Sequence, residues 1–292
     1  MISYRKLAMR VLGHSPVSAV KTARRSTAKR AAALALTAAL VVGMTLPAFA
    51  QDWFIENGDI TISAGESGNN VTQGSTTKEN DTDTVIKSNG SSTAPSNTVT
   101  IHADEGKTVN VTLDNVNIDT SETGEAAVSV TGSGNTNIEL NGNNTLTSGS
   151  GHAGLEHNKE TNSEGKETSG TLTITDNNND GKLTANGGID GAGIGGSDEH
   201  DGQVTITGGE ITATGGNGAA GIGGGAGDTD AVGGDGDVTI SGGTITATGG
   251  RLGAGIGGGA YGNGTVTVTD GDITAKATGR YGAGIGGGYG AK

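Results

Sequence analysis

The sequence contains no cysteine, only three prolines, and aromatic residues at just 2% of its 292 positions. The absence of cysteine excludes disulfide cross-links and a cysteine-linked lipid, so hydrogen bonds and packing must stabilise the fold. No long apolar run occurs after residue 50, and we therefore expect no membrane-spanning helix there. Glycine is abundant, with 57 residues, and no apolar stripe of helical period is present, which argues against helices.

The first 50 residues have the composition of an export signal. They carry eight Lys or Arg and no Asp or Glu, and an apolar run follows over residues 31–46. A basic start, an apolar centre and small residues before residue 51 are typical of secretory signal peptides. We predict a signal peptide over residues 1–50 and a secreted, extracellular or cell-surface location. The remaining chain has 10 basic and 31 acidic residues, a balance that disfavours nucleic acid as a partner.

Glycine-rich units repeat through the second half of the chain. Residues 202–225, 236–259 and 264–288 are near copies, and residues 170–197 form a looser one. Repeats with a constant core and variable linking loops are typical of solenoids, in which each unit stacks on the next. Isoleucine marks the equivalent points of the four units, at Ile194, Ile222, Ile256 and Ile285.

Each unit alternates apolar and hydroxyl residues, as half-buried strands do. β-branched residues dominate residues 238–241 and 245–248, and Gly242 and Gly243 between them predict a tight turn. A third short strand around Ile256 completes the unit, so each unit predicts one three-stranded rung. The residues predicted to point into the core are Val204, Ile206, Ile211, Ala213 and Ile222, with their equivalents Val238, Ile240, Ile245, Ala247 and Ile256.

These patterns predict an all-β, right-handed parallel β-helix of six or seven rungs behind the signal peptide. We assign residues 51–96 to an N-terminal cap and polar loops, residues 97–169 to degenerate rungs and residues 170–292 to regular repeats. Polar composition predicts loops over residues 63–83 and 156–169.

The two ends of the predicted stack differ. Trp53 and Phe54 either cap the N-terminal end of the core or lie in a frayed terminus. At the other end the sequence stops at Lys292, directly after a repeat unit. Because an uncovered end exposes strand edges, we expect a truncated reading frame or an end protected by a partner, end-to-end self-association included.

The GAGIGGG segments resemble the glycine-rich repeats of bacterial cell-surface proteins. Some of those proteins are described as adhesins or as carbohydrate-binding domain-containing proteins, with a pectate-lyase-like right-handed parallel β-helix. The resemblance extends over residues 97–290 and is clearest in the last three units. It implies a surface location and a polysaccharide or host glycan as the partner, although a shared fold does not identify a ligand.

Three of the few aromatic residues flank the GAGIGGG segments: Tyr261, Tyr281 and Tyr289. Sugar CH groups stack on aromatic ring faces while the hydroxyls bind polar partners, so these tyrosines are candidates for a carbohydrate-binding patch. The alternative is that they cover the edges of the rungs.

One loop has half of a calcium-binding pattern. Asp176, Asn178 and Asp180 supply oxygen ligands at alternate positions, and a glycine follows. The twelfth position is Gly187, where a calcium loop needs a bidentate glutamate. A calcium site and a plain turn between two strands both fit, and no other cofactor is expected.

No nucleophile, base and orienting group can be named from the spacing, so we predict no enzymatic activity. Residues 191–196 match the glycine spacing of dinucleotide-binding loops, but the motif recurs in each unit and no helix follows it. The predicted function is a secreted or cell-surface carbohydrate-binding, adhesin-like protein. The alternatives are a structural stalk or passenger domain of a larger surface protein and a calcium-dependent polysaccharide lyase.

Overall fold

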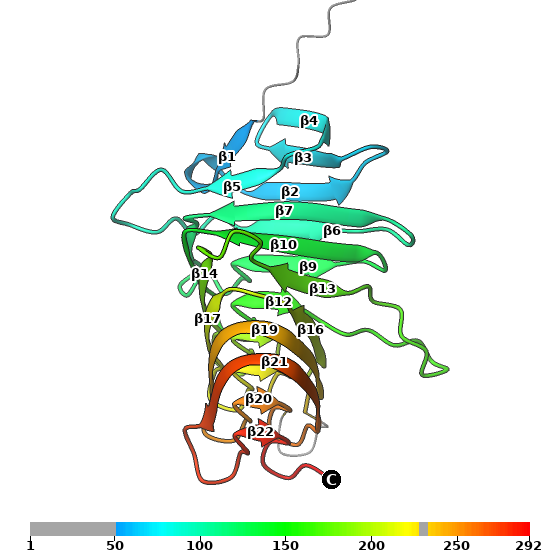
Figure 1. The fold of residues 1–292 in the computed structure, drawn as a ribbon, viewed down its shortest axis with the longest axis vertical. Coiled ribbons are helices and arrows are strands. Elements are labelled where there is room, and N and C mark those ends of the chain that lie inside the picture. Colours follow the sequence, from blue (N-terminus) through cyan, green and yellow to red (C-terminus); the bar gives the residue numbers. More distant parts are fainter. Residues whose placement is uncertain (1–50, 228–232) are drawn as a thin grey trace, which may run out of the picture. The chain divides into compact units, whose positions relative to one another are not determined.

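The computed structural model describes residues 51–227 and 233–292, so the predicted signal peptide lies outside the described residues. In these two ranges the chain forms strands and one short 3-10 helix. No helix in them is long and apolar enough to cross a membrane. The strands wind around one core in successive three-sided turns, which makes this part of the chain a parallel β-helix solenoid, as predicted (Figure 1).

Each turn contributes to three faces, which we call A, B and C. Face A contains β5 (Val85–Lys87), β7 (Thr108–Asp114), β10 (Asn135–Asn141), β13 (Leu172–Thr175) and β16 (Gly202–Ile206). Face B contains β8 (Asn117–Asp119), β11 (Asn143–Thr147), β14 (Lys182–Asn186) and β17 (Glu210–Thr214). Two long bent strands, β19 (Gly236–Gly249) and β21 (Gly264–Ala277), continue both of these faces.

Face C is a separate sheet of shorter strands. Its parallel members are β2 (Ile60–Ala64), β6 (Val99–His102), β9 (Val128–Thr131), β12 (Leu155–His157), β15 (Ile194–Gly195), β18 (Ile222–Gly223), β20 (Ile256–Gly257) and β22 (Ile285–Gly286). One turn runs from face C to face A and then to face B, as in β9, β10 and β11. Six such turns follow one another in the described ranges, beginning at β6, β9, β12, β15, β18 and β20, which confirms the predicted number of rungs.

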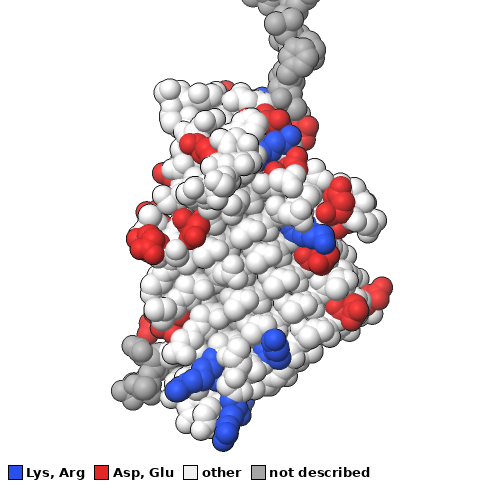
Figure 2. All heavy atoms as spheres, turned by 90° about the vertical axis from the view of Figure 1, so that its left-hand side faces the viewer, with Lys and Arg blue, Asp and Glu red and all other residues white. Residues whose placement is uncertain are grey.

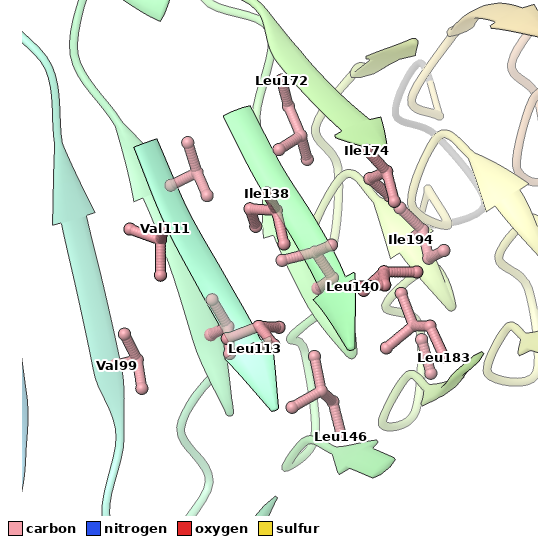
Figure 3. Packing of buried hydrophobic residues seen from close by; sticks show 14 of the residues in the cluster. Val99, Val111, Leu113, Ile138, Leu140, Leu146, Leu172, Ile174, Leu183 and Ile194 are labelled. Atoms are coloured by element: carbon pink, nitrogen blue, oxygen red, sulfur yellow. The ribbon is translucent and has the colours of Figure 1, made fainter. Parts of the chain in front are cut away.

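The core is a set of columns that run along the stack. The predicted equivalence of the isoleucines is confirmed, because Ile194 pairs with Ile222, Ile222 with Ile256, and Ile256 with Ile285. The ten residues predicted to point inward are all at most 1% exposed. Figure 3 shows the same arrangement in earlier turns, where Val111 and Ile138 lie on neighbouring strands and face the interior. Alternation of β-branched and polar residues therefore places one apolar layer inside every turn.

The N-terminal end of the stack is covered by an antiparallel hairpin, which the sequence analysis wrongly assigned to a loop over residues 63–83. β3 (Asn69–Gln73) pairs with β2 and with β4 (Thr76–Asp81). β1 (Asp52–Phe54) and the 3-10 helix η1 (Ile55–Asn57) complete the cap.

Trp53 belongs to this cap and not to a frayed terminus. Its side chain is 1% exposed and its indole N–H donates to Asp81 Oδ2 at 3.1 Å. Burial opposes ionisation of Asp81, yet hydrogen bonds from Lys78 and Trp53 hold its pKa below the ordinary value. This buried polar contact therefore joins β1 to the hairpin strand β4 within the cap.

Two further boundaries differ from the predictions. Gly242 and Gly243 do not end a strand, because β19 bends continuously from face A to face B with a register irregularity at this point. Gly243 has a φ of 91°, which lets the strand turn the corner without stopping. The predicted polar loop over residues 156–169 begins later, since Glu156 and His157 belong to β12 and are buried.

Candidate functional site

The three predicted tyrosines come together at the C-terminal end of the stack. The ring centroids of Tyr261 and Tyr289 lie 5.5 Å apart, and those of Tyr281 and Tyr289 lie 5.2 Å apart, both edge to face. Tyr281 is 61% exposed and Tyr289 is 40% exposed. We call this group of Tyr261, Tyr281 and Tyr289 the tyrosine corner. Its rings form one contiguous, partly exposed aromatic surface.

The main chain holds the tyrosine corner in place. The Tyr261 N–H donates to the Tyr289 carbonyl at 2.6 Å, and the Tyr289 N–H donates to the Leu252 carbonyl at 2.7 Å. Tyr261 has a φ of 64°, an uncommon conformation for a residue with a large side chain. Gly290 lies against its ring, so closely that a Cβ there would be 2.6 Å from Cδ1. Neighbouring turns therefore fix the positions of two of the three rings.

Four basic residues occur in the last turns of the stack, close in sequence to these tyrosines. Arg251 precedes Leu252, Arg280 precedes Tyr281, and both are exposed, as are Lys276 on β21 and Lys292. In the parts of the chain that the structure describes, none of these four cations forms a salt bridge, whereas Lys87, Lys159 and Lys182 do. Figure 2 shows Lys and Arg gathered at this end of the stack, with no Asp or Glu among them on that face.

The predicted calcium loop is closed by its own hydrogen bonds. The Asp180 N–H donates to Asp176 Oδ1 at 3.3 Å, and the Asn178 amide donates to Asn141 Oδ1 at 3.1 Å. Asn179 has a φ of 61°, as in a left-handed turn. Across residues 51–227 and 233–292, no three His, Cys, Asp or Glu side chains gather as a metal site would require. Calcium binding at Asp176, Asn178 and Asp180 stays a prediction.

Three loop residues of successive turns are joined by hydrogen bonds, and we call them the Asx ladder: Asp201, Asp235 and Asn263. The Asp235 N–H donates to Asp201 Oδ1 at 2.7 Å, and the Asn263 N–H donates to Asp235 Oδ1 at 2.6 Å. Burial raises the pKa of Asp201, and the charge of Asp235 adds to this effect.

A hollow of about 390 Å³ lies on face A, and no sequence motif predicted it. Asn110, Asn137 and Glu139 line it from β7 and β10, and residues 82–84 border it. Glu139 accepts hydrogen bonds from the Asn177 main-chain N–H at 2.7 Å and from its side-chain amide at 2.6 Å. These residues lie in separate turns, so only the register of the stack brings them together.

A long strap over residues 158–169 is anchored far away in the sequence. Lys159 Nζ lies 2.8 Å from Asp237 Oδ2 and 3.6 Å from Glu167 Oε2, and its pKa is raised by the hydrogen bond to Asp237. Just before the strap, His157 is buried, and its Nδ1–H donates to the Gln203 carbonyl at 2.9 Å. Burial lowers the pKa of His157, which keeps the imidazole neutral.

The geometry defines the class of this molecule as a solenoid of parallel β-helix repeats. In agreement, a family model described as a β-helix repeat matches residues 178–198, 204–226 and 238–260. Each matched segment contains a face B strand and the face C strand that follows it. No curated protein and no solved structure matches this chain. The match supports the repeat architecture and names no ligand.

Proposed function

We propose that this protein is a secreted or cell-surface carbohydrate-binding protein without catalytic activity, and that the tyrosine corner is its binding site. The observation that carries the proposal is the edge-to-face cluster of Tyr261, Tyr289 and Tyr281, with two of its rings at least 40% exposed. Exposed aromatic faces supply the apolar half of sugar recognition, and nearby hydroxyl and main-chain groups supply the polar half.

The positions of the carboxylates support the non-catalytic part of the proposal. A glycosidase needs two carboxyl groups that flank one bond, with one free to protonate or to attack. Glu139 is bonded to Thr175 and Asn177. Glu156 Oε2 accepts from His152 Nδ1 at 2.8 Å and from the Ala153 N–H. Both side chains are therefore held by structural hydrogen bonds.

The test is binding of the protein to a panel of polysaccharides, measured by affinity electrophoresis and titration calorimetry. The double variant Tyr281→Ala/Tyr289→Ala removes the two exposed rings and should weaken binding by about tenfold or more, which corresponds to about 1.4 kcal/mol. The matched control Tyr281→Phe/Tyr289→Phe keeps the rings and should retain most of the affinity. Unfolding temperatures should stay close to wild type because both substituted rings are partly exposed and no residue of the buried core changes.

Two results would contradict the proposal. One is that no polysaccharide binds, which would favour the structural stalk or passenger domain. The other is the release of reducing ends or unsaturated products from a bound polysaccharide, which would show catalysis.

A further inference from the structure

Charge is divided unevenly along the stack. Residues 249–292 contain four basic and two acidic residues, whereas residues 51–248 contain six basic and 29 acidic ones. The net charges are therefore +2 and −23. An anionic polymer is repelled by most of the body and attracted only at the end that carries the tyrosine corner.

The cations at this end are placed by the same stacking that places the rings. Gly279 packs on the Arg251 carbonyl, so closely that a Cβ would lie 1.8 Å from the oxygen. The loop that carries Arg280 and Tyr281 therefore rests directly on the loop that carries Arg251. Lys276 occupies an outward position of β21, opposite Thr248 in the register.

These cations are free to meet a ligand. In the described ranges Arg251, Arg280 and Lys276 make no salt bridge and no side-chain hydrogen bond, so an incoming anion displaces no existing partner. Guanidinium groups bind carboxylate, sulfate and phosphate through paired hydrogen bonds. Tyr281, whose ring can accept the CH face of a sugar, thus lies on the same loop as Arg280, which can accept the acidic substituent of that sugar.

We infer that the tyrosine corner selects anionic polysaccharides, whose acidic groups pair with Arg251, Arg280 and Lys276 while a sugar face rests on the tyrosines. This inference rests on the proposed carbohydrate-binding function and names the class of ligand. An anionic lipid bilayer is also negatively charged. The net charge of −23 on residues 51–248 disfavours broad contact with such a membrane surface, whereas one end of a polysaccharide chain can reach the tyrosine corner alone.

The test compares two ligands with one backbone, polygalacturonate and its fully methyl-esterified, neutral form. The expected result is tighter binding of the charged form, by about tenfold, and loss of that preference in about 0.5 M NaCl, where exposed charges are screened. The variant Arg251→Gln/Arg280→Gln should lose the preference and keep the weaker binding of the neutral form. The matched control Lys107→Gln/Lys166→Gln changes the same charge on the acidic part of the stack and should bind as wild type does.

The outcomes separate the two proposals. Equal binding of both ligands, or a preference that survives in the arginine variant, overturns the anionic selectivity and leaves carbohydrate binding in place. Binding of neither ligand, nor of any other polysaccharide, overturns both. Binding to phosphatidylserine vesicles in the absence of any polysaccharide binding overturns both and assigns the corner to lipid.

Discussion

At the scale of single residues, the glycines after the face C isoleucines permit the turns to approach closely. Gly195, Gly223 and Gly257 have φ values of 126–133°. A Cβ on each would lie 2.0–2.2 Å from the carbonyl oxygen of the next turn's glycine. Only glycine meets both conditions, since the backbone conformation and the space each exclude a side chain. The glycine spacing that matches a dinucleotide-binding loop is therefore explained by the close stacking of successive turns.

We predict that Gly257→Ala destabilises the protein by roughly 2–4 kcal/mol, because the added methyl group both strains φ and collides with Gly286. Gly74→Ala is the matched control: Gly74 also has a positive φ, of 58°, but has nothing within 4 Å of a Cβ. Its cost should be about 1 kcal/mol. Urea unfolding followed by circular dichroism measures both. Equal destabilisation by the two variants would show that the close approach of the turns does not matter.

At the scale of elements, the strands that could be predicted are those that bury apolar side chains. β16 and β17 alternate fully, and their inward residues are buried as expected. β3 and β4 were not predicted from the sequence because their buried positions include polar residues, Asn69, Gln73 and Asp81. Partners distant in the sequence satisfy these polar groups, such as Asn110, whose carbonyl accepts from Asn69. Composition alone cannot distinguish a bonded polar strand from a loop.

The Asx ladder links turns through main-chain donors and makes stability depend on pH. Burial raises the pKa of Asp201 above its ordinary value of 3.8. The folded state then binds the Asp201 proton more tightly than the unfolded state does. Protonation of Asp201 therefore contributes its full stabilisation of the fold at a pH below the ordinary pKa of 3.8. It is lost as the pH rises through the folded pKa.

Asp201→Asn should therefore raise the unfolding temperature at pH 7 and give no advantage below about pH 3. An asparagine oxygen can still accept the Asp235 N–H, as Asn263 Oδ1 accepts the Lys292 N–H at 3.0 Å. Glu164→Gln removes the same charge from an exposed loop position and is the control. Thermal melts between pH 3 and 8 test this. A loss of stability in Asp201→Asn at pH 7 would mean that the charge itself stabilises the ladder.

At the scale of the whole described stack, the sequence identified the three tyrosines but not their contact. Their positions beside the GAGIGGG segments suggested one binding patch. The turn-to-turn hydrogen bonds that bring Tyr261 and Tyr289 together depend on register, which side-chain patterning leaves open. The strap contact of Lys159 with Asp237 joins residues 78 positions apart and was equally beyond sequence reasoning. The charge division, by contrast, can be counted from the sequence, but only the fold shows that the loop of Arg280 and Tyr281 rests on the loop of Arg251.

Amide hydrogen exchange with and without polygalacturonate tests most directly whether the tyrosine corner binds an anionic polysaccharide. Binding at the tyrosine corner predicts slower exchange in the loops over residues 278–284 and 288–291 and around Arg251. Exchange on face A, including Asn110 and Asn137, should be unchanged, because a bound ligand slows opening only where it contacts the fold. Slower exchange at the face A hollow with no change at the tyrosine corner would contradict binding of the polysaccharide at the tyrosines.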